Sequence, residues 1–153
     1  MNVTILTDAS FCHKTNLAGY GYWIASERGK NGGGGPFKAR VKDNNCAEMM
    51  AICNALYIAQ RLELVQHGDK VLVQTDSNVS IGALTGKHPP SARQAVDAVN
   101  YFKEVTNNLN LTVVFRHVKA HTGKKTDRHV ANHMCDIRAK DGLRQAREQM
   151  KDK

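Results

Sequence analysis

Several features are missing from the sequence, and each absence excludes a class of protein. No apolar run is long enough to cross a membrane as a helix. The N-terminus has no basic region followed by an apolar stretch, so we expect no secretory signal and a cytoplasmic location. The four cysteines show no Cys-x-x-Cys spacing, which in a reducing compartment favours free thiols at Cys12, Cys46, Cys53 and Cys135.

A phosphate-binding loop is missing as well. Residues 29–36 contain four consecutive glycines, but neither a Gly-Lys-Ser/Thr ending nor a following helix accompanies them. This stretch is therefore predicted to be a mobile hairpin turn. The sequence has no internal repeats, apart from a Thr-Asp pair that closes each of two apolar strands. It also has no linker. We therefore expect residues 1–153 to form a single domain.

Positive charge, by contrast, is in excess. The chain of 153 residues carries 22 Lys and Arg against 14 Asp and Glu, a formal net charge of +8. A small basic domain favours a polyanionic partner, and nucleic acid is the leading candidate. The sequence becomes strongly charged from about residue 138, which predicts a charged C-terminal helical tail. We expect the protein to be a monomer.

The hydrophobic pattern predicts an α/β fold. Three strands in a meander come first, and helical segments then alternate with two further strands. This order favours a five-stranded mixed sheet flanked by helices. The expected strands are 3–10, 19–26, 37–41, 70–75 and 111–118, and the expected helices are 46–64, 78–84, 91–107 and 127–149.

Four acidic residues occupy suggestive positions in this arrangement. Asp8 and Asp76 each end an apolar strand after threonine, Glu48 lies near a helix start, and Asp136 lies on the last helix. Taken singly, such acids are explained by capping or by the helix dipole. Together they would repel and raise one another's pKa unless a cation neutralised them. Oxygen ligands select hard cations such as Mg²⁺ or Mn²⁺, and two such ions about 4 Å apart commonly cleave phosphodiesters.

Five short motifs, in order along nearly the whole chain, resemble type 1 ribonuclease H, the bacterial and retroviral type. They are Thr7-Asp8-Ala9-Ser10, Asn44-Asn45-x-x-Glu48-Met49, Thr75-Asp76-Ser77, the stretch from His117 to Gly123, and Asn132-x-x-Cys135-Asp136. Each motif alone is weak, but the set in this order and spacing is specific. The resemblance implies a ribonuclease H-like fold and hydrolysis of the RNA strand of an RNA–DNA hybrid.

Carried over position by position, the resemblance implies a role for several residues. The metal-binding carboxylates would be Asp8, Glu48, Asp76 and Asp136, which would hold two Mg²⁺ ions, with Mn²⁺ able to substitute. His121 would be a mobile-loop histidine that assists proton transfer or product release. Asn44 and Asn45 would contact the minor groove of the hybrid, and Glu48 would also face a ribose 2′-hydroxyl.

The sequence departs from the family pattern in two places. Its first motif reads Asp-Ala-Ser where Asp-Gly-Ser is commoner. The stretch between Asp76 and Lys119 is shorter than in bacterial members that carry a basic handle helix, and it contains no Trp- and Lys-rich protrusion. We therefore expect the hybrid to be held by Lys124, Lys125, Arg128 and the basic C-terminal helix.

Three other interpretations are open at this point. His129 and His133 lie four apart on a helix near Cys135 and suggest a zinc site, although Val130 stands where a zinc protease needs glutamate. A DNA-junction nuclease would share the fold and its strand-borne carboxylates, but the Asn44-Asn45 pair favours the hybrid nuclease. A non-catalytic hybrid-binding module would be expected to lose a carboxylate, and all four are present.

Overall fold

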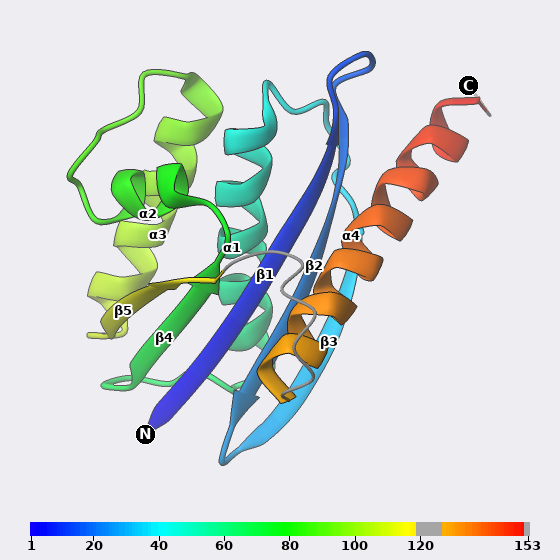
Figure 1. Ribbon diagram of the computed structural model, residues 1–153. Helices are drawn as coiled ribbons and strands as arrows, with labels where there is room; N and C mark the ends of the chain where they lie inside the picture. The colour runs from blue at the N-terminus through cyan, green and yellow to red at the C-terminus, as the bar shows by residue number, and fades with distance from the viewer. Residues whose placement is uncertain (119–126, 152–153) are drawn as a thin grey trace.

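The protein folds around one five-stranded sheet. A computed structural model describes residues 1–118 and 127–151 and gives the strand order β3-β2-β1-β4-β5 (Figure 1). The strands are β1 Asn2–Cys12, β2 Leu17–Ser26, β3 Gly29–Pro36, β4 Lys70–Thr75 and β5 Thr112–His117; the helices are α1 Asn44–Arg61, α2 Asn78–Leu84, α3 Arg93–Asn108 and α4 Asp127–Lys151. None of these helices is long and apolar enough to cross a membrane.

β1 is the central strand, and its two neighbours run in different directions. It pairs antiparallel with β2 and parallel with β4, and β4 pairs parallel with β5. The α/β fold with a mixed sheet is therefore confirmed. Successive side chains on a strand point to opposite faces, so Val3 and Ile5, both 1% exposed in the core, alternate with Leu6 and Asp8 on the other face.

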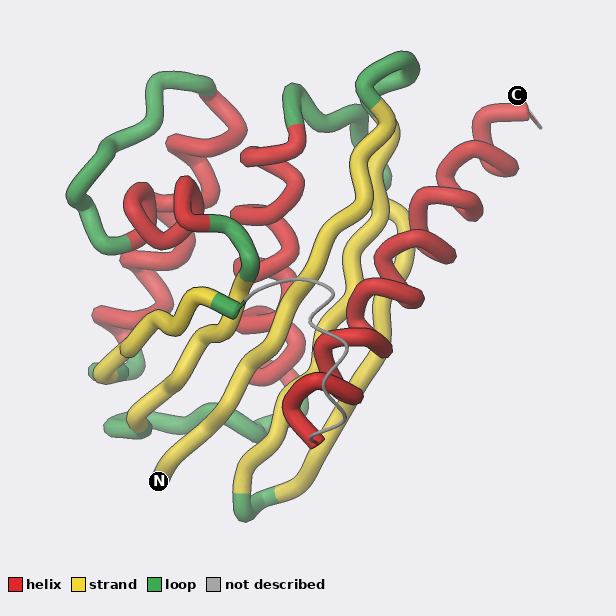
Figure 2. The backbone as a smooth tube through the Cα atoms, viewed as in Figure 1, coloured by secondary structure: helices red, strands yellow, loops and turns green. Residues whose placement is uncertain are grey.

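Helices cover both faces of this sheet. α1 and α3 pack against one face and build the main core with β1, β2 and β4, whereas α4 crosses β1, β2 and β3 on the other face (Figure 2). The apolar part of α4 continues past the point where its sequence becomes charged, since Ala139, Leu143 and Ala146 are all buried. The four cysteines are free thiols, as expected.

The start of α1 is set by the polar residues before it. The Asp43 side chain accepts a hydrogen bond from the Cys46 amide at 2.8 Å and caps the helix. The helix begins at Asn44, two residues earlier than expected, and Glu48 is consequently its fifth residue. No acidic residue lies in the first turn, so complementing the helix dipole does not explain Glu48.

The expected hairpin turn at residues 29–36 and the expected strand at 37–41 are both wrong. Gly29–Pro36 is itself the edge strand β3, and residues 37–41 have no regular structure. The physical reason is the close approach of α4. A Cβ atom on Gly34 would meet the Tyr20 carbonyl oxygen and the Arg138 side chain, so a glycine-rich strand fits beneath α4 where ordinary strand residues would not.

A second segment also differs in detail from its prediction. β5 was expected over residues 111–118; it spans Thr112–His117 and is an edge strand with alternating exposure. Val113 and Phe115 pack against the core, while Val114 is 43% exposed. Val114 lies on the other face of the sheet, where α4 packs over β1, β2 and β3, so its side chain stays near solvent.

A buried ion pair fixes the end of the sheet at which β4 begins. Asp69 is 2% exposed, and its Oδ1 accepts a hydrogen bond from Arg28 Nη2 at 2.9 Å while its Oδ2 accepts one from Nη1. Oδ2 also accepts the Gln66 amide at 2.8 Å. The Arg28 guanidinium holds the pKa of this carboxyl well below its usual range. Asp69 thus joins the β2–β3 turn to the connection before β4.

Replacement of Gly21 is expected to test the close packing of α4. In Gly21→Ala, the new Cβ would overlap the Cys135 carbonyl oxygen, a backbone atom that cannot rotate away. We expect a loss of about 1 to 3 kcal/mol in the free energy of unfolding, measured by urea denaturation. Gly35→Ala on β3 is the matched control, because its Cβ meets Tyr20 at an ordinary 3.6 Å. Equal stability of the two variants would contradict close packing at Gly21.

Candidate active site

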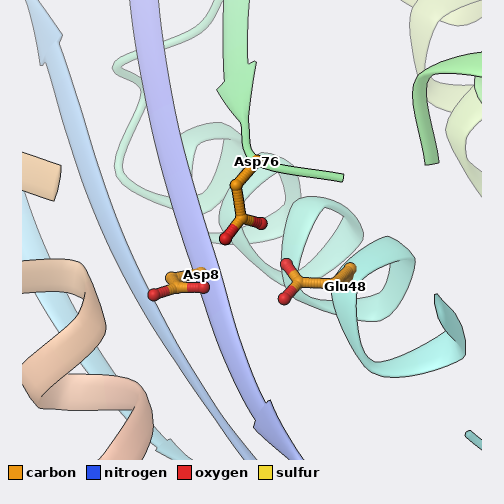
Figure 3. A group of neighbouring side chains, drawn as sticks. All are labelled: Asp8, Glu48 and Asp76. Carbon is orange, nitrogen blue, oxygen red and sulfur yellow. The ribbon is translucent and has the colours of Figure 1, made fainter. Parts of the chain in front are cut away.

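Two carboxylates meet where β1 and β4 part. These strands pair in parallel as far as Leu6 opposite Gln74, and Asp8 and Asp76 each lie two residues beyond that last pair. Both side chains therefore project on the same face at the same level. We call this point, at Asp8 and Asp76, the fork. Figure 3 shows the two carboxylates turned toward each other there.

A third carboxylate reaches the fork from α1. Glu48 is 4% exposed, and its side chain points toward Asp8 and Asp76 (Figure 3). Each of the three residues offers an oxygen atom, and these atoms lie within 4.8 Å of one another. Within the described ranges 1–118 and 127–151, no other group of three His, Cys, Asp or Glu residues has this geometry.

The three carboxylates repel one another when no cation is present. Burial, with added repulsion from Asp76 and Asp8, raises the pKa of Glu48 to about 9. Burial and then the charge of Asp76 raise the pKa of Asp8 to about 7, although the Ala9 amide, donating to Asp8 Oδ1 at 2.9 Å, opposes this shift. Close carboxylates of this kind need either a proton or a positive charge between them.

The donor set fits a hard divalent cation. Glu48 Oε2 is buried and has no hydrogen-bond partner in the described part of the chain. Buried polar atoms are nearly always satisfied, so an unsatisfied carboxylate oxygen aimed at two further carboxylates marks a place for a positive ligand. Oxygen-only coordination by acids is typical of Mg²⁺ and Mn²⁺ rather than of zinc.

Asp136 approaches the fork from α4. Its charge and a hydrogen bond between the two carboxyls contribute to the raised pKa of Asp8, so the two side chains are neighbours. Asp136 Oδ2 also pairs with Lys140 Nζ at 3.1 Å, one helical turn further along. All four predicted acids are thus brought to one place, with Asp136 outside the tight group of three.

The remaining predicted site residues are divided between two surfaces. Asn44 and Asn45 are exposed in the first turn of α1, ahead of Glu48 on the same helix. Arg128 lies in the first turn of α4. The predicted residues His121, Lys124 and Lys125 lie outside the described residues.

The geometry does not favour the zinc interpretation. Cys135 is buried at the sheet, where its Sγ contacts the Leu6 carbonyl oxygen at 3.7 Å. His133, by contrast, is exposed on another side of α4. Residues on different faces of a helix cannot coordinate one ion together.

Two residues near the fork were missed by sequence reasoning. Gln74 is 4% exposed, and its Oε1 has no hydrogen-bond partner among the described residues. A polar residue within the otherwise apolar strand before Asp76 was the available signal. Lys140 was missed because pairing with Asp136 needs only the common i, i+4 spacing, which occurs on most exposed helices. His117, next to the fork, has its Nε2 at 3.0 Å from the Asp76 carbonyl oxygen.

Comparisons with known proteins agree with this geometry. A family model described as RNase H matches residues 1–144. One solved structure similar to the chain is RNase H1 from the halophilic archaeon Halobacterium salinarum NRC-1, with a TM-score of 0.73 and 20% identity over 95% of this chain and 100% of the other. Another is the N-terminal RNase H domain of a Mycobacterium tuberculosis protein, with a TM-score of 0.72 and 17% identity over 94% of this chain and 99% of the other. A third is LC11-RNase H1 in complex with an RNA/DNA hybrid, with a TM-score of 0.68 and 20% identity over 94% of this chain and 98% of the other. No curated protein sequence matches significantly.

Removal of one buried charge is expected to stabilise the metal-free protein. With raised pKa values of about 7 and about 9 at Asp8 and Glu48, the folded state keeps protons that the unfolded state releases above about pH 4. Stability therefore falls as pH rises from about 4 toward 9. We expect Glu48→Gln to raise the melting temperature in EDTA at pH 8 and to leave it unchanged at pH 4, with a gain of about 1 to 3 kcal/mol.

The control for this experiment is Glu148→Gln, an exposed acid near the end of α4. It should leave the melting temperature unchanged at both pH values. Added MgCl₂ should stabilise wild type more than Glu48→Gln, since the cation replaces the missing protons. A melting temperature of Glu48→Gln at or below that of wild type at pH 8 would contradict the electrostatic interpretation.

Proposed function

The chain belongs to the RNase H family, and on that basis we propose that it is an endonuclease that hydrolyses the RNA strand of RNA–DNA hybrids by two-metal-ion catalysis. The observation that carries this proposal is the convergence of Asp8, Glu48 and Asp76 within 4.8 Å at the fork, with Asp136 beside them. A structural neighbour solved with an RNA/DNA hybrid supports the choice of substrate.

We propose that the four carboxylates hold two Mg²⁺ ions and that Mn²⁺ can substitute. The oxygen-only donor set and the unsatisfied Glu48 Oε2 support this assignment. The chemistry that such ions supply when bound is activation of the attacking water and stabilisation of the leaving oxygen. A metal-dependent nuclease needs several acids in fixed positions, which this site provides from β1, α1, the end of β4 and α4.

Each element contributes differently to the site. Asp8 lies on β1 and Asp76 directly follows the last residue of β4, so the central sheet fixes both backbone positions. Glu48 is held in the core by the buried face of α1, and its neighbours exclude water from its carboxylate. In our proposal this carboxylate also faces a ribose 2′-hydroxyl, which distinguishes RNA from DNA.

Substrate contacts are proposed for two residues at the start of α1 and for basic residues at or shortly before the start of α4 in the sequence. Asn44 and Asn45, exposed at the start of α1, would read the minor groove of the hybrid. Lys124, Lys125 and Arg128 would neutralise phosphates, in keeping with the net charge of +8. His121 would take or give a proton near neutral pH or assist product release. The cytoplasmic location and the monomeric state stay predictions.

Loss of one strand carboxylate is expected to abolish cleavage. Asp76→Asn keeps the shape of the side chain and removes a charge that metal binding needs, so we expect a folded protein with no measurable turnover in Mg²⁺. The measurement is cleavage of a labelled RNA–DNA hybrid by purified protein. Asp97→Asn, an exposed acid on α3, is the control and should retain wild-type activity. Near wild-type turnover by Asp76→Asn would remove Asp76 from the site.

The same assay separates the alternative functions. We expect cutting of the hybrid only, because both the 2′-hydroxyl and the hybrid groove are needed. A four-way DNA junction cut instead would indicate the junction nuclease. Binding of the hybrid with no cutting in either Mg²⁺ or Mn²⁺ would indicate the non-catalytic module. Equal cutting of single-stranded RNA would contradict recognition of the duplex.

Binding of the hybrid is expected to weaken steeply with salt. Each neutralised phosphate adds roughly 0.7 to 0.9 to the slope of log affinity against log salt, so Lys124→Ala with Lys125→Ala should lower that slope by about 1.4 to 1.8. The measurement is a titration of catalytically inactive protein with hybrid at several salt concentrations. Lys70→Ala with Lys103→Ala removes the same charge from β4 and α3 and should leave the slope unchanged. An unchanged slope in the Lys124→Ala, Lys125→Ala variant would show that other residues neutralise the phosphates of the hybrid.

A further inference from the structure

The connection between β3 and α1 is irregular, yet its backbone is held by hydrogen bonds from Arg40 to Lys42. Between Arg40 and Lys42 the chain forms no strand or helix. Two amide side chains from distant parts of the sequence nevertheless hold it, Asn16 from the β1–β2 turn and Gln94 from α3. Irregular segments with this degree of fixed hydrogen bonding are commonly those whose geometry matters for binding.

Gln94 acts on two backbone groups at once. Its Oε1 accepts a hydrogen bond from the Lys42 amide at 2.8 Å, and its Nε2 donates to the Arg40 carbonyl oxygen at 2.9 Å. One planar amide therefore pairs with the chain on both sides of Val41, as a neighbouring strand would do. This fixes the distance of the segment from α3.

Asn16 holds the same segment from the opposite side. Its Nδ2 donates to the carbonyl oxygens of Val41 at 3.0 Å and of Lys42 at 3.2 Å, and its own carbonyl oxygen accepts the Val41 amide at 2.8 Å. Asn16 has a φ of +59°, a left-handed conformation that asparagine tolerates better than most residues. Val41 is 1% exposed, so its side chain anchors the segment in the core.

The segment held in this way ends at the start of α1. Asp43 follows directly and caps the helix, and Asn44 and Asn45 are the first exposed residues after the cap. The connection between β3 and α1 also carries three exposed cations, Lys38, Arg40 and Lys42, and no ion pair engages them within the described part of the chain. Arg40 and Lys42, next to the proposed minor-groove contacts, are thus placed by the hydrogen bonds of Gln94 and Asn16 to their backbone.

We propose that Gln94 and Asn16 are positioning residues for hybrid binding, acting through the 40–42 backbone on the start of α1. The inference rests on the proposed function and deepens it. Both side-chain amides make their hydrogen bonds to the backbone of residues 40–42 and not to the carboxylates of the fork. Glu48 is fixed by its own burial one turn further along, between Ala47 and Met49, which are at most 2% exposed. The two amides should therefore influence the affinity for the hybrid and not the chemical step.

The test compares KM with kcat. Gln94→Met has a similar length and neither donor nor acceptor, so it should raise KM for the hybrid about three- to tenfold, with kcat within about twofold of wild type. Asn16→Gly keeps the left-handed conformation without the amide and should act in the same direction. Because both residues hold one segment, the double variant should show a combined effect that is not additive. Asn100→Met, exposed on α3, is the matched control and should change neither constant.

A second readout is independent of activity. Amide hydrogen exchange at Lys42 in the free protein should become faster in Gln94→Met, since that N–H loses its acceptor. Unchanged exchange, an unchanged KM, or a kcat that falls together with the rise in KM would each overturn the inference. If Gln94→Met is poorly folded by its melting temperature, Asn16→Gly carries the same comparison. A wild-type protein that does not cleave the hybrid would refute the proposed function, and that result is distinct from all of these.

Discussion

Repulsion among carboxylates at the fork is the constraint around which this molecule is arranged. Asp8, Glu48 and Asp76 lie within 4.8 Å of one another, and in water such a group would move apart. Parallel pairing of β1 with β4 fixes two of them at one level, and the buried face of α1 fixes the third. Much of the core thus maintains an arrangement that is unfavourable until a cation binds.

The glycines of β2 and β3 extend this arrangement to α4. They let α4 approach the backbone of the sheet, which brings Asp136 beside Asp8 and leaves Lys140 paired with it. Ordinary side chains at Gly21 or Gly34 would lift the helix and move Asp136 away with it. The run of glycines that predicts a turn in the sequence is therefore required to place Asp136 at the site.

The sequence predicted those features that local patterns determine. Asp8 and Asp76 were identified because each closes an apolar run in the sequence, and α1 was identified from its hydrophobic pattern. β3 was missed because glycine has low intrinsic strand propensity, and the contact that compensates lies more than one hundred residues away on α4. Gln74 was missed for a similar reason, since its burial depends on the register of β4 between β1 and β5. Local patterns contain no such long-range information.

Buried acids near the two ends of β4 differ in whether their carboxylate oxygens have hydrogen-bond partners. Asp69, before the first residue of β4, has partners for both carboxylate oxygens, whereas Glu48, near the other end roughly 20 Å away, has an oxygen with none. The ion pair that stabilises the fold and the carboxylates of the proposed active site therefore lie in separate regions of the structure. Substitutions around Asp69 can therefore raise the stability of the fold without altering the carboxylates at the fork. Stability and catalytic chemistry can evolve separately in this protein.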